Sequence, residues 1–244
     1  MVGQTVGKRL TIFAVALALS SAATAAPLDP LGDPAQFQRD VAELNRKPLP
    51  DGEPLARVVG AAVAVDARQR GRCTPNKISI GALSPVTLDG MITSMVAAGQ
   101  IENAWLTAVK LDDCPPAAPI RVLLLRMADG VALQGIFAGQ GESLAWPTLA
   151  REALKATVPH AVNALRRADP ACAPKDLTAT DVKVADRSPD LGPDVYGLRL
   201  KGSWREIWTF EPCGHRITVP ISFTANGTGG ASWDIDGGGI VYVP

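Results

Sequence analysis

The four cysteines of this 244-residue chain recur at one fixed offset. Cys73 and Cys172 are 99 positions apart (172 − 73), and Cys114 and Cys213 are separated by the same distance (213 − 114). Self-similarity at a fixed period is the mark of repeated structural units. The cysteines alone therefore divide the chain into two segments of similar design.

The same offset aligns further positions around the cysteines. It places Trp105 on Trp204, Pro75 on Pro174, and the alternating apolar residues Ile120, Val122 and Leu124 on Val219, Ile221 and Phe223. We therefore predict two tandem copies of one module, the first over residues 26–140 and the second over residues 141–244. A mature chain of about 220 residues can bury its core as one domain or as two small ones.

Residues 1–25 have the layout of a secretory signal peptide. Lys8 and Arg9 precede an apolar run that ends in the small-residue sequence Ala23-Thr24-Ala25. The strongly apolar part, Leu10–Leu19, is too short to span roughly 30 Å of hydrocarbon, which disfavours the alternative of an uncleaved membrane anchor. We expect a periplasmic or secreted protein with no transmembrane anchor after signal cleavage.

The net charge gives no reason to expect a polyanionic partner. The chain has 24 basic and 24 acidic side chains, and two of the basic ones, Lys8 and Arg9, lie in the expected signal peptide. A mature chain this close to neutrality has no electrostatic reason to bind nucleic acid or anionic lipid. We expect no nucleic-acid partner.

Four cysteines in an exported chain predict two disulfides. Three pairings are possible, and the repeat selects Cys73–Cys114 together with Cys172–Cys213, because each copy would then close its own loop. The alternative is a zinc site, but the chain has no CxxC pair and neither of its two histidines lies at ligand spacing from two cysteines. We expect no metal and no cofactor.

Hydrophobic periodicity predicts that each copy begins with helices and continues as an antiparallel β-meander, which is an α+β fold. The expected helices are Pro34–Lys47, Glu53–Arg70 (with a strand over Val58–Val65 as the alternative), and one from Trp146 to about Thr157 that continues over His160–Ala168 after a kink or break at Pro159. The expected strands of the first copy are Lys77–Leu83, Met91–Ala97, Ile101–Leu111, Ile120–Met127 and Val131–Phe137. Those of the second copy are Leu177–Val184, Val195–Leu200, Trp204–Glu211, Arg216–Thr224, Ala231–Ile235 and Ile240–Val243.

Motifs for catalysis and cofactor binding are missing from the sequence. His160 and His215 are the only histidines, and neither has a Ser and an Asp in a pattern typical of a catalytic triad. Ser143 stands at the wrong position for a G-x-S-x-G nucleophile elbow, and neither a P-loop nor a strand followed by G-x-G-x-x-G is present. The segment Asp234–Gly237 lacks the further acids of a calcium loop, so a hairpin turn is the better interpretation.

One expected strand carries an unusual face. Alternation along Trp204–Glu211 places Trp204, Glu206, Trp208 and Phe210 on the same side. A carboxylate among aromatic rings could bind a cation or a polar ligand, and tryptophan is over-represented at binding hot spots. If this face is exposed, we predict a binding surface at Trp204, Glu206 and Trp208; the alternative is an aromatic face that packs on a helix, with Glu206 at its rim.

These residues belong to a longer pattern, W-x-E-x-W-x(4)-C-G, that ends at Cys213 and Gly214 and is followed by an alternating strand and an Asn226-Gly227 turn. The pattern resembles a C-terminal hairpin of uncharacterised exported proteins of Gram-negative bacteria, and it covers roughly the last 45 residues. The resemblance implies no particular function. The first copy departs from it, with Thr107, Val109 and Pro115 at the positions of Glu206, Trp208 and Gly214. A site in this hairpin would therefore leave the first copy as a scaffold.

Three functions are open on the sequence. The leading hypothesis is a non-enzymatic periplasmic or secreted interaction protein that binds a protein or a cell-envelope component, for example as an inhibitor or immunity protein. The second is a small secreted hydrolase that uses the carboxylates of Asp112, Asp113, Glu206 and Glu211. The third is a structural envelope protein. Facing carboxylates in a deep pocket would favour the hydrolase, an exposed aromatic face the interaction protein, and a buried aromatic face the structural protein.

Overall fold

The computed structural model describes residues 33–114, 118–174 and 176–244, so the expected signal peptide lies outside the described residues. The described part forms four α-helices and two antiparallel sheets, which confirms the expected α+β class. The helices are α1 (Pro34–Leu44), α2 (Gly52–Gln69), α3 (Gly90–Ala97) and α4 (Pro147–Ala168). The first sheet contains β1 (Ile78–Ile80), β2 (Ser84–Pro85), β3 (Ile101–Leu111), β4 (Ile120–Met127) and β5 (Leu133–Gln140). The second contains β6 (Asp181–Arg187), β7 (Ser203–Phe210), β8 (Arg216–Ala225), β9 (Ala231–Ile235) and β10 (Val241–Val243).

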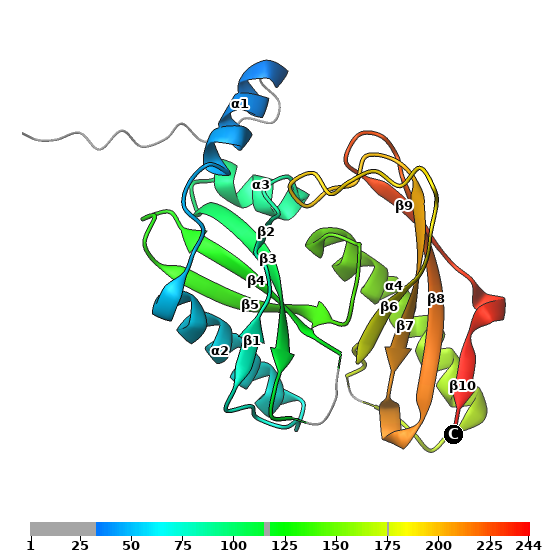
Figure 1. The fold of residues 1–244 in the computed structure, drawn as a ribbon. Helices are drawn as coiled ribbons and strands as arrows, with labels where there is room; N and C mark the ends of the chain where they lie inside the picture. The colour runs from blue at the N-terminus through cyan, green and yellow to red at the C-terminus, as the bar shows by residue number, and fades with distance from the viewer. Residues whose placement is uncertain (1–32, 115–117, 175) are drawn as a thin grey trace, which may run out of the picture.

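Each sheet is built from one continuous stretch of the chain. The strand order is β1-β3-β4-β5 in the first sheet, where β2 also pairs with β3, and β10-β8-β7-β6 in the second, where β9 also pairs with β8. Figure 1 shows the two sheets on opposite sides of the molecule, with the start of α4 between them. In these strand orders, β5 and β6 each lie at one edge of their sheet. Residues from both strands line a cleft between the two halves.

The first sheet is covered by helices on both faces. Its layer against α2 consists of the buried side chains Val59, Ala62, Val63, Val109, Ile120, Val122 and Leu124. The opposite face of β4 presents Leu123 and Leu125 to α1 and α3. Because side chains alternate along a strand, Arg121 shares the face of Leu123 and points away from α2. This places a cation on the side of the first sheet that faces the second half.

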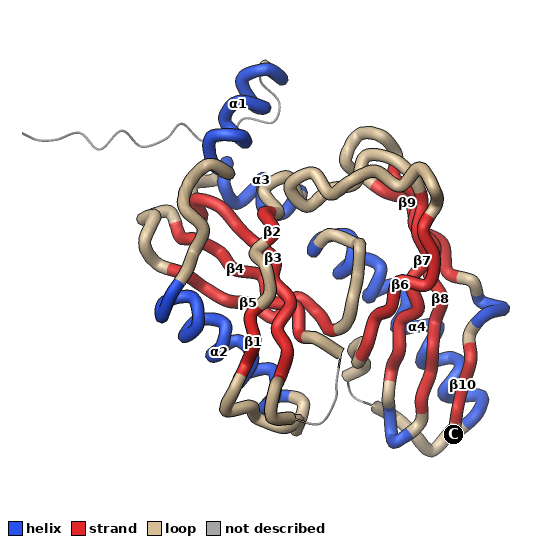
Figure 2. The backbone as a smooth tube through the Cα atoms, viewed as in Figure 1, coloured by secondary structure: helices blue, strands red, loops and turns tan. Residues whose placement is uncertain are grey.

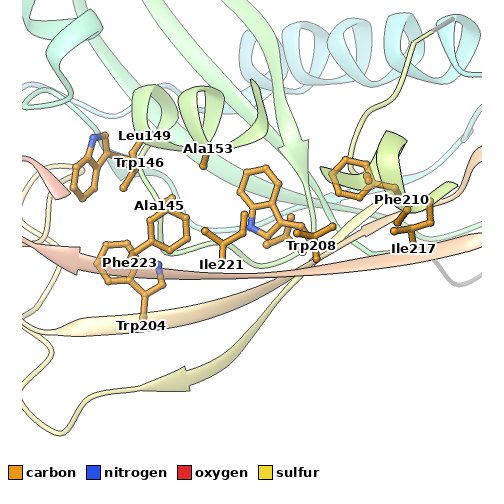
Figure 3. Close-up of a cluster of buried hydrophobic side chains, with 14 of the residues drawn as sticks. Ala145, Trp146, Leu149, Ala153, Trp204, Trp208, Phe210, Ile217, Ile221 and Phe223 are labelled. Atoms are coloured by element: carbon orange, nitrogen blue, oxygen red, sulfur yellow. The ribbon is translucent and has the colours of Figure 1, made fainter. Parts of the chain in front are cut away.

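The second sheet is covered by α4 on one face, as Figure 3 shows. The burial of β7 alternates strictly, with Trp204, Glu206, Trp208 and Phe210 all buried. The ring of Trp204 stacks on that of Phe223 at a centroid distance of 5.0 Å. The predicted alternation and the packing of the aromatic face on a helix are therefore correct, but Glu206 lies inside this core and not at its rim.

Two of the expected strands are wrong, and each has a local physical reason. Met91–Ala97 is helical because the Asp89 side chain accepts hydrogen bonds from the backbone N–H groups of Met91 and Ile92, which starts α3. Val195–Leu200 contains only an isolated bridge, because Tyr196 has a φ of 50° and turns the chain back. This segment lies in the long loop between β6 and β7, which extends towards α3 (Figure 2) and accepts a hydrogen bond from Leu88 N at Tyr196 O, 3.0 Å.

Two ambiguities about helices are settled by the structure. The segment Val58–Val65 lies inside α2, so the alternative of a strand is wrong. Pro159 lies inside α4, which continues from Pro147 to Ala168 without a break. Proline has no N–H group, so the carbonyl group one helical turn before Pro159 lacks its usual donor. The Pro159 side chain is exposed, so this carbonyl group lies on the side of α4 that water can reach.

The outer edge of the second sheet is one strand in two pieces. Strands β9 and β10 both pair with β8, so the Asp234–Gly237 segment does not form the expected hairpin turn. Between them lies a short 3-10 helix, Gly237–Gly239, next to Pro220 of β8. Pro220 O accepts a hydrogen bond from Asp236 N at 3.2 Å, so the backbone of Pro220 points towards this edge. The N and C=O of one residue point to the same side of an antiparallel strand, so the missing N–H of Pro220 is missing on this side. The outer strand is thus interrupted beside the one residue of β8, Pro220, that cannot donate a backbone hydrogen bond to it.

Both predicted disulfides are present, Cys73–Cys114 and Cys172–Cys213, each with a sequence separation of 41. Each one joins the segment after a long helix to the end of a long strand, α2 to β3 in the first half and α4 to β7 in the second. In the second half a hydrogen bond joins the same two segments, between His215 Nε2 and Asp169 Oδ2 at 3.0 Å. This hydrogen bond is the main reason why the pKa of Asp169 lies below its usual value.

None of the helices within residues 33–114, 118–174 and 176–244 has the length and apolar character needed to traverse a bilayer. The two disulfides are compatible with a periplasmic or extracellular location, because disulfides persist in oxidising compartments.

Candidate functional site

The segment Gly141–Thr148, which we call the linker, consists of the connection from β5 to α4 and the first two residues of α4, and it lies between the two sheets. Gly141 begins it with a φ of 85°, and a Cβ atom there would lie 2.3 Å from the backbone N and O atoms of Val182. Only glycine allows such a close approach to β6. The next residue fixes the contact, because Glu142 N donates to Val182 O at 2.6 Å.

Glu206 of β7 binds the linker from the side of the second sheet. Its Oε1 atom accepts hydrogen bonds from Leu144 N at 2.8 Å and from Ala145 N at 3.3 Å. The Ser143 hydroxyl donates to both carboxylate oxygens at 3.0 Å. Three donors of this buried carboxylate therefore come from consecutive residues of the linker.

Two tryptophans complete the surroundings of the Glu206 carboxylate. Trp204 Nε1 donates to Oε1 at 3.0 Å, and Trp208 Nε1 donates to Oε2 at 2.9 Å. Glu206 itself is 0 % exposed. A buried carboxylate is costly unless its oxygens accept hydrogen bonds, and here five groups donate to them. The carboxylate thus holds the linker, and the indole N–H groups hold the carboxylate.

Arg121 of β4 binds the linker from the side of the first sheet. Its Nη2 atom donates to Ala145 O at 3.0 Å, so the Ala145 backbone is held at its C=O by Arg121 and at its N–H by Glu206. Arg121 is only 7 % exposed. Burial lowers the pKa of its guanidinium, and the negative charge of Glu206 opposes this shift.

Asp89 fixes the end of the linker. Its Oδ1 atom accepts from the first turn of α3 and from the Thr148 hydroxyl at 2.6 Å, and its Oδ2 atom accepts from Thr148 N at 2.7 Å. One buried aspartate from the first half therefore caps α3 and also the first turn of α4. The linker is held at its start, its middle and its end.

The three residues predicted to bind a partner, Trp204, Glu206 and Trp208, are brought together by the structure but are all buried. They form no exposed surface, and their polar atoms are used within the molecule. Trp208 alone also contributes to the wall of a cleft.

The carboxylates of the hydrolase hypothesis are not brought together. Glu206 is buried in the core of the second half, whereas Asp112, Asp113 and Glu211 are exposed. Each exposed acid has its own partner: Ser79 donates to Asp112, the backbone of Asn76 to Asp113, and Arg216 to Glu211. The hydrogen bond from Asn76 N is also the main reason why the pKa of Asp113 is lowered. These contacts give no facing pair of carboxylates.

A cleft of about 490 Å³ opens between β5 and α4, and we call it the β5–α4 cleft. Its apolar wall includes Leu123 of β4, Ile136 and Ala138 of β5, and Pro147, Ala150 and Leu154 of α4. Val182 and Trp208 of the second sheet also line it. The volume and the mainly apolar wall are those of sites that bind small molecules in proteins.

The charged side chains that line this cleft are all cations: Arg70, Arg121 and Arg151. Arg70 is already paired with Asp66, donates to Thr178, and lies 4.4 Å from the centre of the Phe137 ring. Arg151 is exposed. Arg121 is the one deeply buried cation of the three.

Sequence reasoning missed Arg121 and Asp89. Arg121 does have a signal, because it is a cation at the second position of the otherwise apolar run Ile120–Leu125, where every neighbour is buried. Asp89 also has one, since an aspartate directly before Gly90-Met91-Ile92 fits a helix N-cap. Nothing in the sequence indicates that both contact the linker.

Comparison of the chain with protein-family models, with curated proteins and with solved structures gives no match.

Proposed function

We propose that this chain is an exported, non-enzymatic binding protein that holds a small apolar molecule in the β5–α4 cleft. The observation that carries the proposal is the cleft itself, about 490 Å³ in volume, with apolar side chains from both halves of the molecule. The disulfides support an oxidising compartment, in which a cell-envelope component is the natural source of such a molecule.

The wall of the cleft is rigidly supported, which favours binding. Ala150 and Leu154 belong to α4, whose start is fixed by Asp89, and Leu123 belongs to the central strand β4. A site that is already formed loses little conformational freedom when it binds a ligand. The hydrolase hypothesis has no comparable support, because its carboxylates lie apart. The burial of Trp204, Glu206 and Trp208 favours a structural envelope protein over a protein that binds its partner at this face, so the binding proposal depends on the cleft and not on the aromatic face.

Binding can be measured with N-phenyl-1-naphthylamine, a neutral apolar fluorophore. We expect saturable binding to the wild-type protein with one site per chain. The substitution Ala150→Phe places a phenyl ring in the cleft and is expected to weaken binding at least about tenfold, since it removes most of the space for an apolar ligand. Fluorescence titration gives both dissociation constants.

The matched control is Ala61→Phe, which introduces the same side chain at an exposed position of the other long helix, α2. It should bind the fluorophore as the wild type does. Thermal unfolding of both variants verifies that they fold. Absence of saturable binding to the wild type, or equal binding by Ala150→Phe and the wild type, would contradict the proposal.

We also propose that the two halves, residues 26–140 and 141–244, are tandem copies of one module. The support is that the offset of 99 carries the end of α2, Gln69, to the end of α4, Ala168, and carries β3 and β4 onto β7 and β8 within a few residues. In both halves the chain runs from a long helix through an antiparallel meander, with a disulfide at the equivalent place.

A further inference from the structure

The β5–α4 cleft is electrostatically one-sided. Among the described residues that line it, three are arginines and none is acidic. Asp66 neutralises Arg70, so the excess of positive charge belongs to Arg121 and Arg151. The protein as a whole has equal numbers of basic and acidic side chains, so this excess is local. A positively charged wall beside an apolar one is complementary to a molecule that has an apolar body and an anionic end.

Arg121 has hydrogen-bonding capacity to spare. A guanidinium has five N–H donors, and the described residues give Arg121 one acceptor, Ala145 O. Its Nε and Nη1 atoms have no acceptor among the described residues, and Arg121 is one of the residues that line the cleft. None of the ion pairs among the described residues, with a limit of 4.0 Å between nitrogen and oxygen, involves Arg121. The most buried cation of the cleft is thus incompletely paired.

The negative charge of Glu206, which opposes the lowering of the Arg121 pKa, cannot complete this pairing. Glu206 attracts Arg121 from a distance, as its effect on the Arg121 pKa shows, but both oxygens of Glu206 are already occupied by donors from the linker and from two tryptophans. A buried cation that has no direct contact with a negative charge is stabilised when an oxyanion binds it directly.

We propose that the natural ligand is an amphiphile with an oxyanion headgroup, a carboxylate or a phosphate, and that Arg121 binds this headgroup through its free N–H donors. This inference rests on the proposed function, because it names the class of molecule that the same cleft binds.

The register of the first sheet gives the orientation of the ligand. Arg121 pairs with Gly139, and two positions further along β4 Leu123 pairs with Ile136. The apolar body therefore extends from Arg121 along β4 and β5, past Leu123, towards Ile136, which is 42 % exposed at the edge of the sheet. The Ala150 and Leu154 side chains of α4 cover it from the other side.

The test compares three ligands of equal chain length: 1-decanol, decanoate and decyl phosphate. Each displaces N-phenyl-1-naphthylamine from the wild-type protein, and the concentrations for half-displacement are compared. We expect at least one of the two anions to bind about tenfold more tightly than the alcohol, because hydrogen bonds to charged groups are the stronger ones. The ratio between decanoate and decyl phosphate identifies the headgroup. If neither anion binds better than the alcohol, the inference is wrong.

Two variants change the preference in opposite directions. Arg121→Gln is expected to abolish the preference for the anion while binding of the alcohol remains. Glu206→Gln removes the negative charge that competes for Arg121 and is expected to increase the preference several-fold. Arg126→Gln, on the same strand but outside the cleft, is the matched control and keeps the wild-type ratio. An unchanged preference in folded Arg121→Gln overturns the assignment of Arg121.

The outcomes separate this inference from the proposed function. If the fluorophore and 1-decanol do not bind, the proposed function fails. If both bind and the anions have no advantage, the proposed function stands and the headgroup inference fails. Should Arg121→Gln not fold, the comparison of the three ligands on the wild-type protein still decides whether the headgroup matters.

Discussion

At the scale of single residues, Glu206 shows how a charge is stabilised inside an apolar core. It stands on a strand whose inward neighbours are Trp204, Trp208 and Phe210, and it is as buried as they are. The indole N–H groups of the two tryptophans are donors within an otherwise apolar surface, so they can bind the carboxylate without adding another charge. The tryptophans are therefore structural partners of Glu206 in addition to being core side chains.

This role can be measured by comparing two tryptophans that the offset of 99 places at equivalent positions. Trp204→Phe removes a hydrogen bond to a charged group, whereas Trp105, which is equally buried, has no hydrogen-bond partner for its indole among the described residues. We expect Trp204→Phe to lower the free energy of unfolding by about 1.5–3 kcal/mol more than Trp105→Phe does. Urea unfolding of both variants gives the difference, and equal losses would contradict the structural role of the Trp204 indole N–H.

The sequence allowed part of this arrangement to be predicted. Alternation alone placed Trp204, Glu206 and Trp208 on one face, and that is correct. It could not show what covers the face, because Ser143, Leu144 and Ala145 are about 60 positions away and are brought to Glu206 only by the tertiary fold. Whether the face is exposed was therefore not decidable from the pattern.

At the scale of elements, Asp89 joins two helices that belong to different halves. An N-cap usually satisfies the free N–H groups of one helix. Here one carboxylate accepts from the first turn of α3 through Oδ1 and from Thr148 at the start of α4 through both oxygens. The direction of α4, and with it one wall of the β5–α4 cleft, therefore depends on a residue of the first half.

We predict that Asp89→Ala loosens both helices. Loss of an N-cap costs about 1 kcal/mol for each helix, so the free energy of unfolding should fall by about 2 kcal/mol or more. Hydrogen exchange should accelerate at the amides of Met91, Ile92 and Thr148 together. Asp33→Ala, which removes the cap of α1 alone, is the control and should leave these three amides unchanged. Faster exchange confined to α3 would show that Asp89 does not hold α4.

The elements also show where prediction from local pattern succeeds and fails. The strands Ile101–Leu111 and Ile120–Met127 were predicted with their observed bounds, because they are long, alternating or uniformly apolar, and central in the sheet. Met91–Ala97 was assigned to a strand because a short apolar run fits either structure, and the cap at Asp89 decides for the helix. The position of Arg121 within an apolar strand is a signal of its own, but hydrophobic periodicity does not indicate the role of a single cation.

At the scale of the whole molecule, the two halves are joined by more than the covalent connection. The linker is bound by Arg121 from one sheet and by Glu206 from the other. On the far side of the linker, the loop between β6 and β7 contacts the segment before α3, where a Cβ atom at Gly197 would lie 2.8 Å from Val86 Cα. The halves therefore present a cleft with fixed walls.

The two disulfides should stabilise the two halves to the same extent. Both have a sequence separation of 41, and in the chain-entropy model a loop of this length contributes about 4 kcal/mol. We predict that the double substitutions Cys73→Ser/Cys114→Ser and Cys172→Ser/Cys213→Ser lower the free energy of unfolding by similar amounts in urea. A clearly larger loss for one pair would mean that its effect does not come from loop closure alone.

The interrupted outer edge of the second sheet has a consequence for the behaviour of the protein at high concentration. An unbroken edge strand exposes a row of free N–H and C=O groups on which another chain can add as a further strand, and such templating is a route to aggregation. The 3-10 helix beside Pro220 divides this edge into β9 and β10, of five and three residues, with no continuous ladder across the gap. The protein thus leaves Val241 and Val243 exposed on a strand too short to recruit a neighbouring molecule into a growing sheet.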